Sequence, residues 1–178
     1  MTQFIKNKKL KELNINFFKN YLGFGFQVFF GFLITVIIIH FKGFSFLGVF
    51  AQIYAIFVIA GQLSVLGIND SALNNISRNI NSRHEENIIR SAIQASVVNG
   101  SIFALLLFLN QSLLFNFFQS IEILNNLDIL SLAIIFFTVN KVLFSVINGK
   151  KLFNYFAFLN FFRPLCILII LSFFVVFD

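Results

Sequence analysis

Charged residues are scarce in this sequence of 178 residues: Asp, Glu, Lys and Arg together make up 11% of the chain, and apolar residues make up 58%. A soluble domain carries charge on about a quarter of its residues, so the composition excludes that class. The net charge of +6 arises mainly from lysines and arginines between apolar runs, which is typical of contact with a membrane surface rather than with nucleic acid.

Cysteine, histidine and acidic residues are also few. The single Cys166 excludes an intramolecular disulfide. His40 and His84 fall in connections on opposite sides of the expected membrane, so they cannot share a metal ion. The seven acidic residues fall at the ends of apolar segments or outside them, and no glycine-rich loop ends in Gly-Lys-Ser/Thr. These absences argue against an enzyme, and we expect no cofactor.

Five apolar segments are each about long enough to cross ~30 Å of hydrocarbon as a helix. The sequence therefore predicts one all-α integral membrane domain over residues 1–178. Within the polar connection 69–90, Ser82-Arg83-His84-Glu85 has the spacing of a capping box and predicts a helix start. Asn99-Gly100-Ser101 and Asn110-Gln111-Ser112 interrupt the third segment, where we expect a kink or an early end. The predicted spans are 20–40, 46–68, 87–115, 127–148 and 155–177.

The distribution of Lys and Arg predicts the orientation of these spans. The segment 1–19, the connection 69–90 and the turn 149–154 carry five, three and two such residues, whereas the opposite side carries only Lys42. Because positive charge collects on the cytoplasmic side, we expect a cytoplasmic N-terminus and an outside C-terminus.

Two cations lie inside predicted spans, Lys141 in the fourth and Arg163 in the fifth. Counted from the turn at Gly149, both fall roughly 10–12 Å below the same membrane face. One interpretation is an anion-binding wall, because arginine holds phosphate oxygens with a bidentate fork. The other is that both side chains extend toward the cytoplasmic headgroups.

Polar residues accompany these cations. Lys141 belongs to a polar stripe at helical spacing with Ser131, Thr138, Ser145 and Asn148. Asn160 precedes Arg163 by one turn. Pro164 either opens the helix near a site or is a tolerated kink. Other polar residues in the spans line a lumen or form hydrogen bonds between helices. The candidates for a lumen are Gln27, Gln52, Gln62, Asn99 and Asn160.

Two stretches resemble a known family of membrane transporters. The run from Leu47-Gly48-Val49-Phe50-Ala51 to Leu66-Gly67-Ile68-Asn69-Asp70-Ser71-Ala72, followed by Ser77-Arg78-Asn79, is similar to the second-helix region of the polysaccharide flippases. These are the O-antigen and capsule-type exporters of the multidrug/oligosaccharidyl-lipid/polysaccharide exporter superfamily. Asn148-Gly149-Lys150-Lys151-Leu152-Phe153-Asn154-Tyr155 resembles their basic turn between helices four and five.

The resemblance implies export of a lipid-linked oligosaccharide, of the undecaprenyl-pyrophosphate type, across the bacterial cytoplasmic membrane. It also implies that Arg163 and Lys141 line a cationic cavity. Family members have twelve or more helices in two lobes, so five spans correspond to the amino-terminal part of one lobe. We expect a truncated chain, or one that assembles with a second chain. The alternatives are a piece of a drug or ion antiporter, and a membrane scaffold subunit of a polysaccharide-assembly complex.

Overall fold

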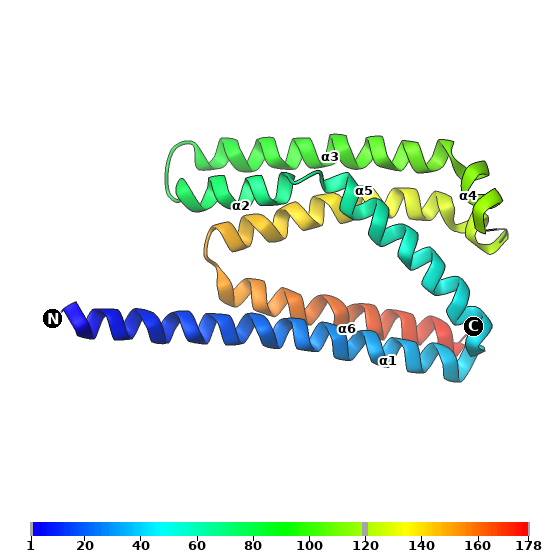
Figure 1. Cartoon of the computed structure of the whole chain (residues 1–178), viewed down its shortest axis with the longest axis horizontal. Helices are drawn as coiled ribbons and strands as arrows, with labels where there is room; N and C mark the ends of the chain where they lie inside the picture. Colours follow the sequence, from blue (N-terminus) through cyan, green and yellow to red (C-terminus); the bar gives the residue numbers. More distant parts are fainter. Residues whose placement is uncertain (1, 119–120, 178) are drawn as a thin grey trace. The chain divides into compact units, whose positions relative to one another are not determined.

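The structure, a computed structural model, consists of helices (Figure 1). It describes residues 2–118 and 121–177, except for the side chains of 2–20, 117 and 122–125. No strand occurs in this described part. A helix satisfies its own backbone hydrogen bonds, as apolar surroundings require. The helices are α1 (Thr2–Val65), α2 (Ile68–Arg78), α3 (Glu85–Leu109), α4 (Gln111–Phe118), α5 (Ile121–Gly149) and α6 (Phe153–Phe177).

Four helical segments of the described residues are long and apolar enough to cross a membrane, which confirms the predicted all-α membrane class. The first covers 45 residues, more than twice the length that a bilayer requires. At Gly43 its backbone leaves the helical conformation, with φ 82° and ψ 178°. This break lies between the first two predicted spans, at a residue that adopts a positive φ without a steric penalty. The four segments are Tyr21–Val65, Glu85–Leu109, Asn126–Gly149 and Phe153–Phe177.

The predicted connection 69–90 is largely helical. Helix α2 occupies its first half because Ile68, Ala72 and Ile76 recur at helical spacing, and the last two are buried. The predicted capping box is not formed. Helix α3 begins at Glu85, whose carboxylate accepts a hydrogen bond from the Asn81 backbone N–H at 2.7 Å, and the Ser82 hydroxyl forms no hydrogen bond among the described residues.

The third predicted span was drawn to residue 115, with a kink or an early end expected at Asn110-Gln111-Ser112. Helix α3 does end there, at Leu109. Asn110 caps this end: its backbone leaves the helical conformation, with φ −102° and ψ 23°, and its side-chain amide donates a hydrogen bond to the Leu106 carbonyl at 2.7 Å. Helix α4 then begins at Gln111, whose amide donates to the Asp128 carboxylate of α5 at 2.7 Å. By contrast, α3 runs without interruption through Asn99-Gly100-Ser101.

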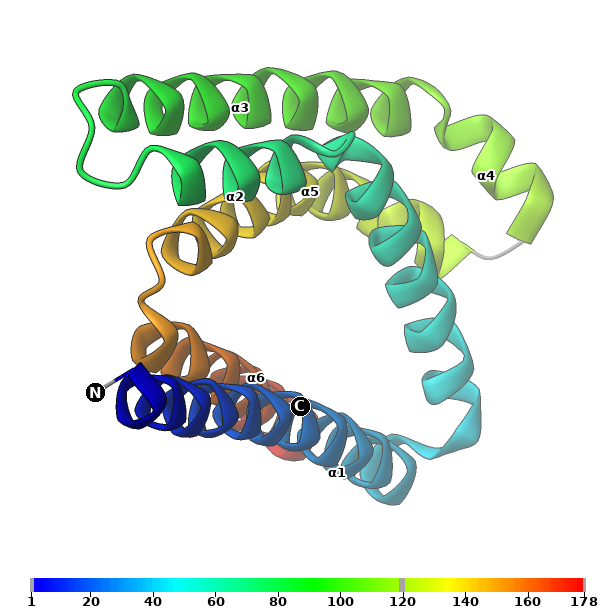
Figure 2. The same cartoon turned by 60° about the vertical axis from the view of Figure 1, so that its left-hand side comes forward.

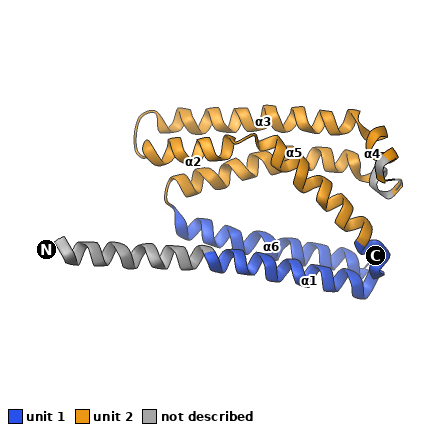
Figure 3. Ribbon diagram, viewed as in Figure 1, with its two compact units in different colours: residues 1–47, 152–178 blue, residues 48–151 orange. Residues whose placement is uncertain are grey.

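The chain divides into two compact units (Figure 3). Unit 1 combines residues 1–47 with residues 152–178, and so pairs the first part of α1 with α6. Their contact includes Phe161 of α6, whose ring lies 4.9 Å from that of Phe26 and 5.7 Å from that of Phe30, between centroids. Helix α6 continues through Pro164, which is buried. The aromatic edges and faces therefore join two segments that are far apart in the sequence.

Unit 2 comprises residues 48–151, with the second part of α1 and helices α2 to α5. Figure 2 shows α2 and α3 side by side within this unit. One cluster of buried residues joins α1 and α5 through Ile56, Leu127 and Leu130. A second cluster joins α2 and α5, with Ala72 and Ile76 against Val142 and Val146.

Candidate functional site

Lys141 and Gln62 meet within unit 2. The Lys141 ammonium, on α5, donates a hydrogen bond to the side-chain carbonyl of Gln62, on α1, at 2.5 Å. The same ammonium lies 5.8 Å from the centroid of the Phe137 ring, one helical turn earlier on α5. The Lys141 side chain is half-buried. Both contacts suit a cation: the carbonyl dipole and the face of the ring each present negative charge.

The position of Phe137 depends on a glycine. A Cβ atom placed on Gly61 would lie 2.7 Å from a carbon of the Phe137 ring, closer than real Cβ contacts allow. The absence of a side chain at residue 61 therefore lets the ring pack directly on the α1 backbone. Phe57, one turn earlier on α1, contacts the same ring edge-on at 5.1 Å between centroids. The ring beside Lys141 is thus held from two positions on α1.

A buried hydroxyl pair lies on the same two helices. Ser64 Oγ and Thr138 Oγ1 are 2.5 Å apart and have no exposed surface. Each hydroxyl is also placed to donate to a carbonyl of its own helix, that of Gly61 or that of Ile134, at 2.8 Å. Because each hydroxyl has one proton, two hydroxyls supply two of these three hydrogen bonds at a time. The pair fixes α1 against α5 next to Lys141.

Helix α3 approaches this region through small residues. Ser96, Gly100 and Ala104 recur every four residues and are all buried. A Cβ atom on Gly100 would lie 3.1 Å from the Cα atom of Ile135, on α5. Small residues allow two helix backbones to come this close. Neither this stripe nor Gly61 and Ser64 is among the candidates predicted from the sequence, although the four-residue spacing of Ser96, Gly100 and Ala104 is a visible signal.

The other candidates in unit 2 do not join the pair of Lys141 and Gln62. Gln52 is exposed and lies about 15 Å along α1 from Gln62. Asn99 is half-buried on α3, next to the buried Gly100. Of the predicted stripe on α5, Ser131 and Thr138 are buried, and Ser131 donates to the Leu127 carbonyl at 2.8 Å. The stripe therefore faces the interior of unit 2 at these positions.

Arg163, Asn160 and Gln27 belong to unit 1, whereas Lys141 belongs to unit 2. Arg163 is exposed on α6, and Gln27 is exposed on α1. Asn160 is half-buried against Gly23, where an added Cβ would lie 3.2 Å from the Asn160 Cβ. Its amide nitrogen is buried and forms no hydrogen bond within the described chain. An unsatisfied buried donor of this kind costs about 1–3 kcal/mol.

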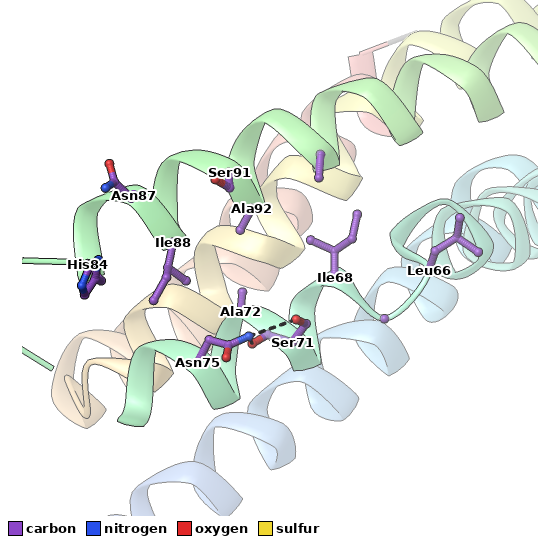
Figure 4. A pocket seen from close by; sticks show the side chains of 12 residues that line it. Leu66, Ile68, Ser71, Ala72, Asn75, His84, Asn87, Ile88, Ser91 and Ala92 are labelled. Carbon is purple, nitrogen blue, oxygen red and sulfur yellow. Dashed lines mark hydrogen bonds between the residues drawn. The ribbon is translucent and has the colours of Figure 1, made fainter. Parts of the chain in front are cut away.

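Two cavities of unit 2 are lined by residues other than Lys141 and Gln62. The larger, of about 560 Å³, is a groove between α2 and α3 (Figure 4), which we call the α2–α3 groove. Its lining includes Leu66, Ile68, Asn75, His84 and Asn87. The smaller, of about 350 Å³, is lined by Ser82, Glu85, Glu86, Ile89 and Lys150.

An ion pair crosses the smaller cavity. The Lys150 ammonium lies 2.8 Å from the Glu85 carboxylate, and so joins the start of α3 to the turn after α5. Among the described residues, no group of three His, Cys, Asp or Glu side chains is arranged to hold a metal ion.

No family model matches the chain, and no curated protein or solved structure shows significant similarity to it.

Proposed function

We propose that the chain is the amino-terminal part of a flippase that exports a lipid-linked oligosaccharide. The observation that carries this proposal is the contact of Lys141 with Gln62 between two helices that are able to span a membrane. A lysine inside such a span costs about 2.5–3.5 kcal/mol on insertion, and ionisable groups kept there despite this cost usually mark the path of a substrate or ion.

The chemistry of the pair favours an anionic substrate. The Gln62 carbonyl orients the ammonium but has no charge of its own. The amide of Gln62 also has a nitrogen that donates hydrogen bonds. Lys141 and Gln62 are therefore able to donate together to the oxygens of a phosphate or pyrophosphate group. This matches the pyrophosphate that links the glycan to its lipid in the family that the sequence resembles.

The rest of the proposal comes from the sequence. The excess of Lys and Arg on one side favours a cytoplasmic N-terminus and an outside C-terminus in a bacterial cytoplasmic membrane. Arg163 on α6 is the other cationic candidate for binding the substrate, and Gln27, Gln52, Asn99 and Asn160 are the candidates for the lumen. Partners are the lipid bilayer, the undecaprenyl-pyrophosphate type of substrate, and a second chain that completes the transporter. We propose neither a catalytic activity nor nucleic-acid binding for this chain.

A leaflet-exchange assay on reconstituted vesicles tests this function. A fluorescent polyprenyl-pyrophosphate oligosaccharide is incorporated with the chain, and the rate at which its head group appears in the opposite leaflet is measured. Lys141→Met keeps most of the side-chain volume and removes the charge, and Gln62→Glu adds a carboxylate beside the ammonium. We expect each variant to lower the rate at least about tenfold, the size of effect that follows from loss of one charged hydrogen bond.

Lys42→Met is the matched control, because it also removes one lysine, next to Gly43 and outside the pair, and it should leave the rate unchanged. Binding of the same lipid to each variant is measured in parallel, so that an effect on recognition is seen even when exchange requires a second chain. If Lys141→Ala combined with Arg163→Ala retains both binding and exchange, the cationic site is refuted and a scaffold subunit becomes the better explanation.

A further inference from the structure

The α2–α3 groove changes in polarity along its length. Figure 4 shows His84 and Asn87 at one end, and Leu66 and Ile68 at the other. Helices α2 and α3 run antiparallel here, so the apolar end is bounded by the start of α2 and by Ala92 and Ala95 of α3. The lining therefore provides separate surfaces for the two halves of an amphipathic molecule.

The direction of this change agrees with the direction expected across a membrane surface. The part of α1 between Gly43 and Val65 is about 33 Å long, close to the thickness of the hydrocarbon layer. Helix α2 continues from that point with mostly polar residues, including Asn74, Asn75 and Arg78. We therefore expect the Leu66 end of the groove to lie near the edge of the hydrocarbon, and the His84 end to lie at the level of the head groups.

Cations lie beside the polar end. Arg78 follows Asn75 by three residues on α2, which places it on the same face of the helix as the groove lining. Arg83 directly precedes His84, and both arginines are exposed. Glu85 and Glu86 line the separate, smaller cavity, where Glu85 is paired with Lys150, and the Asp70 carboxylate lies in the first turn of α2, toward the opposite end of the groove. The charge beside the head-group end therefore favours an anion.

From these observations we propose that the α2–α3 groove binds one anionic phospholipid, with its phosphate near Arg78 and Arg83 and its first acyl carbons on Leu66, Ile68 and Ala95. Asn75 and Asn87 supply polar contacts to the glycerol and ester region between them. This lipid site is independent of the transport function proposed above. It lies on a different pair of helices from Lys141 and Gln62, and its test does not use transport.

The chain contains no tryptophan, so one introduced tryptophan reports on one position. Ala95→Trp places the reporter at the apolar end of the groove. Val98→Trp, one turn later on α3 at an exposed position outside the groove, is the control. Each variant is reconstituted in phosphatidylcholine that contains a small fraction of phosphatidylglycerol with brominated acyl chains, and the quenching of fluorescence is measured. The reverse labelling, with bromine on phosphatidylcholine, gives the relative affinity.

We expect phosphatidylglycerol to be enriched at least about fivefold at residue 95 and to show no enrichment at residue 98, since each arginine near anionic head groups contributes about that factor. Arg78→Gln with Arg83→Gln should abolish the enrichment at residue 95 but leave the helical content unchanged. Equal affinities at the two positions, or enrichment that survives both arginine substitutions, would refute the site.

Competition with soluble glycerol phosphate shows whether the groove binds a lipid or a free phosphate compound. It should not reduce the quenching at residue 95, and displacement of the brominated lipid at millimolar glycerol phosphate would show that the groove binds a soluble anion instead. If Ala95→Trp does not insert into vesicles, Leu66→Trp reports from the same end of the groove, and the same two comparisons decide the outcome.

Discussion

Gly61→Ala is expected to destabilise unit 2, although alanine is the better helix former. The new methyl group would lie 2.7 Å and 2.8 Å from two carbons of the Phe137 ring, so the ring must move. Overpacking of this kind costs about 1–3 kcal/mol. The higher helix propensity of alanine offsets about 1 kcal/mol of this cost. Because Phe137 lies beside Lys141, the displacement should also disturb the contact between Lys141 and Gln62.

The matched control for this prediction is Gly48→Ala on the same helix, where nothing lies within 4 Å of the added Cβ. This variant gains helix propensity without a clash, so it should be neutral or slightly stabilising. The two variants should therefore differ by about 1–3 kcal/mol, which corresponds to about 2–12 °C in thermal midpoint for a chain of this size. Unfolding in detergent micelles, followed by circular dichroism, measures the difference.

A further substitution tests the cause. The double variant Gly61→Ala with Phe137→Leu lacks the ring that the methyl group meets. Its loss of stability should therefore be smaller than the sum of the losses in the two single variants. If Gly61→Ala and Gly48→Ala have the same midpoint, the close packing of Phe137 on α1 is refuted. If the double variant loses the sum of the two single effects, the clash is not the reason for the destabilisation.

Three other predictions concern the buried hydroxyl pair, the backbone at Gly67 and the ion pair of the smaller cavity. A double-mutant cycle with Ser64→Ala and Thr138→Val should give a coupling free energy of about 0.6 kcal/mol, the mean for hydrogen bonds between membrane helices, and additive effects in unfolding assays would contradict the hydroxyl pair. Gly67→Ala should lower stability by about 1 kcal/mol because Gly67 has φ 75°, whereas Gly31→Ala, in open space, should not. Glu85→Lys should lower the thermal midpoint by placing two cations together, and adding Lys150→Glu should restore it; failure of the swap to do so would show that the pair in the smaller cavity is not formed in solution.

The spans were predictable because the apolar runs are long, and their ends were less so because single polar residues decide them. The expected early end at Asn110-Gln111-Ser112 is found, at Leu109, but the sequence left open whether the helix would end there or only kink and continue to Phe115. The polar residues of 69–78 indicate a connection by composition. The apolar Ile68, Ala72 and Ile76, recurring every four residues, nevertheless form the packed face of α2. Periodicity was the better guide than composition at this point.

The pair of Lys141 and Gln62 was predictable only as two separate candidates. The two residues are 79 positions apart, and helical spacing gives the face of each helix but not the rotation of one helix against another. That rotation depends on close contacts such as those at Gly61 and Gly100, where the absence of a side chain determines which faces meet. The capping box failed for a similar reason: its spacing is correct, but the Glu85 carboxylate reaches the Asn81 N–H in a turn that the spacing does not specify.

Unit 1 is made of two segments that are far apart in the sequence, and this has a consequence for the synthesis of the protein. Its two segments are separated by all of residues 48–151, so the helix that carries Phe26 and Phe30 leaves the ribosome well before Phe161. At about 5–20 residues per second, the delay is on the order of 5–20 s. During this delay, the aromatic face of the first segment contacts lipid or an insertase. All residues of unit 2 are synthesised before α6, so unit 2 is able to assemble earlier than unit 1. We therefore expect unit 2 to assemble before unit 1, although the first segment of unit 1 is synthesised first.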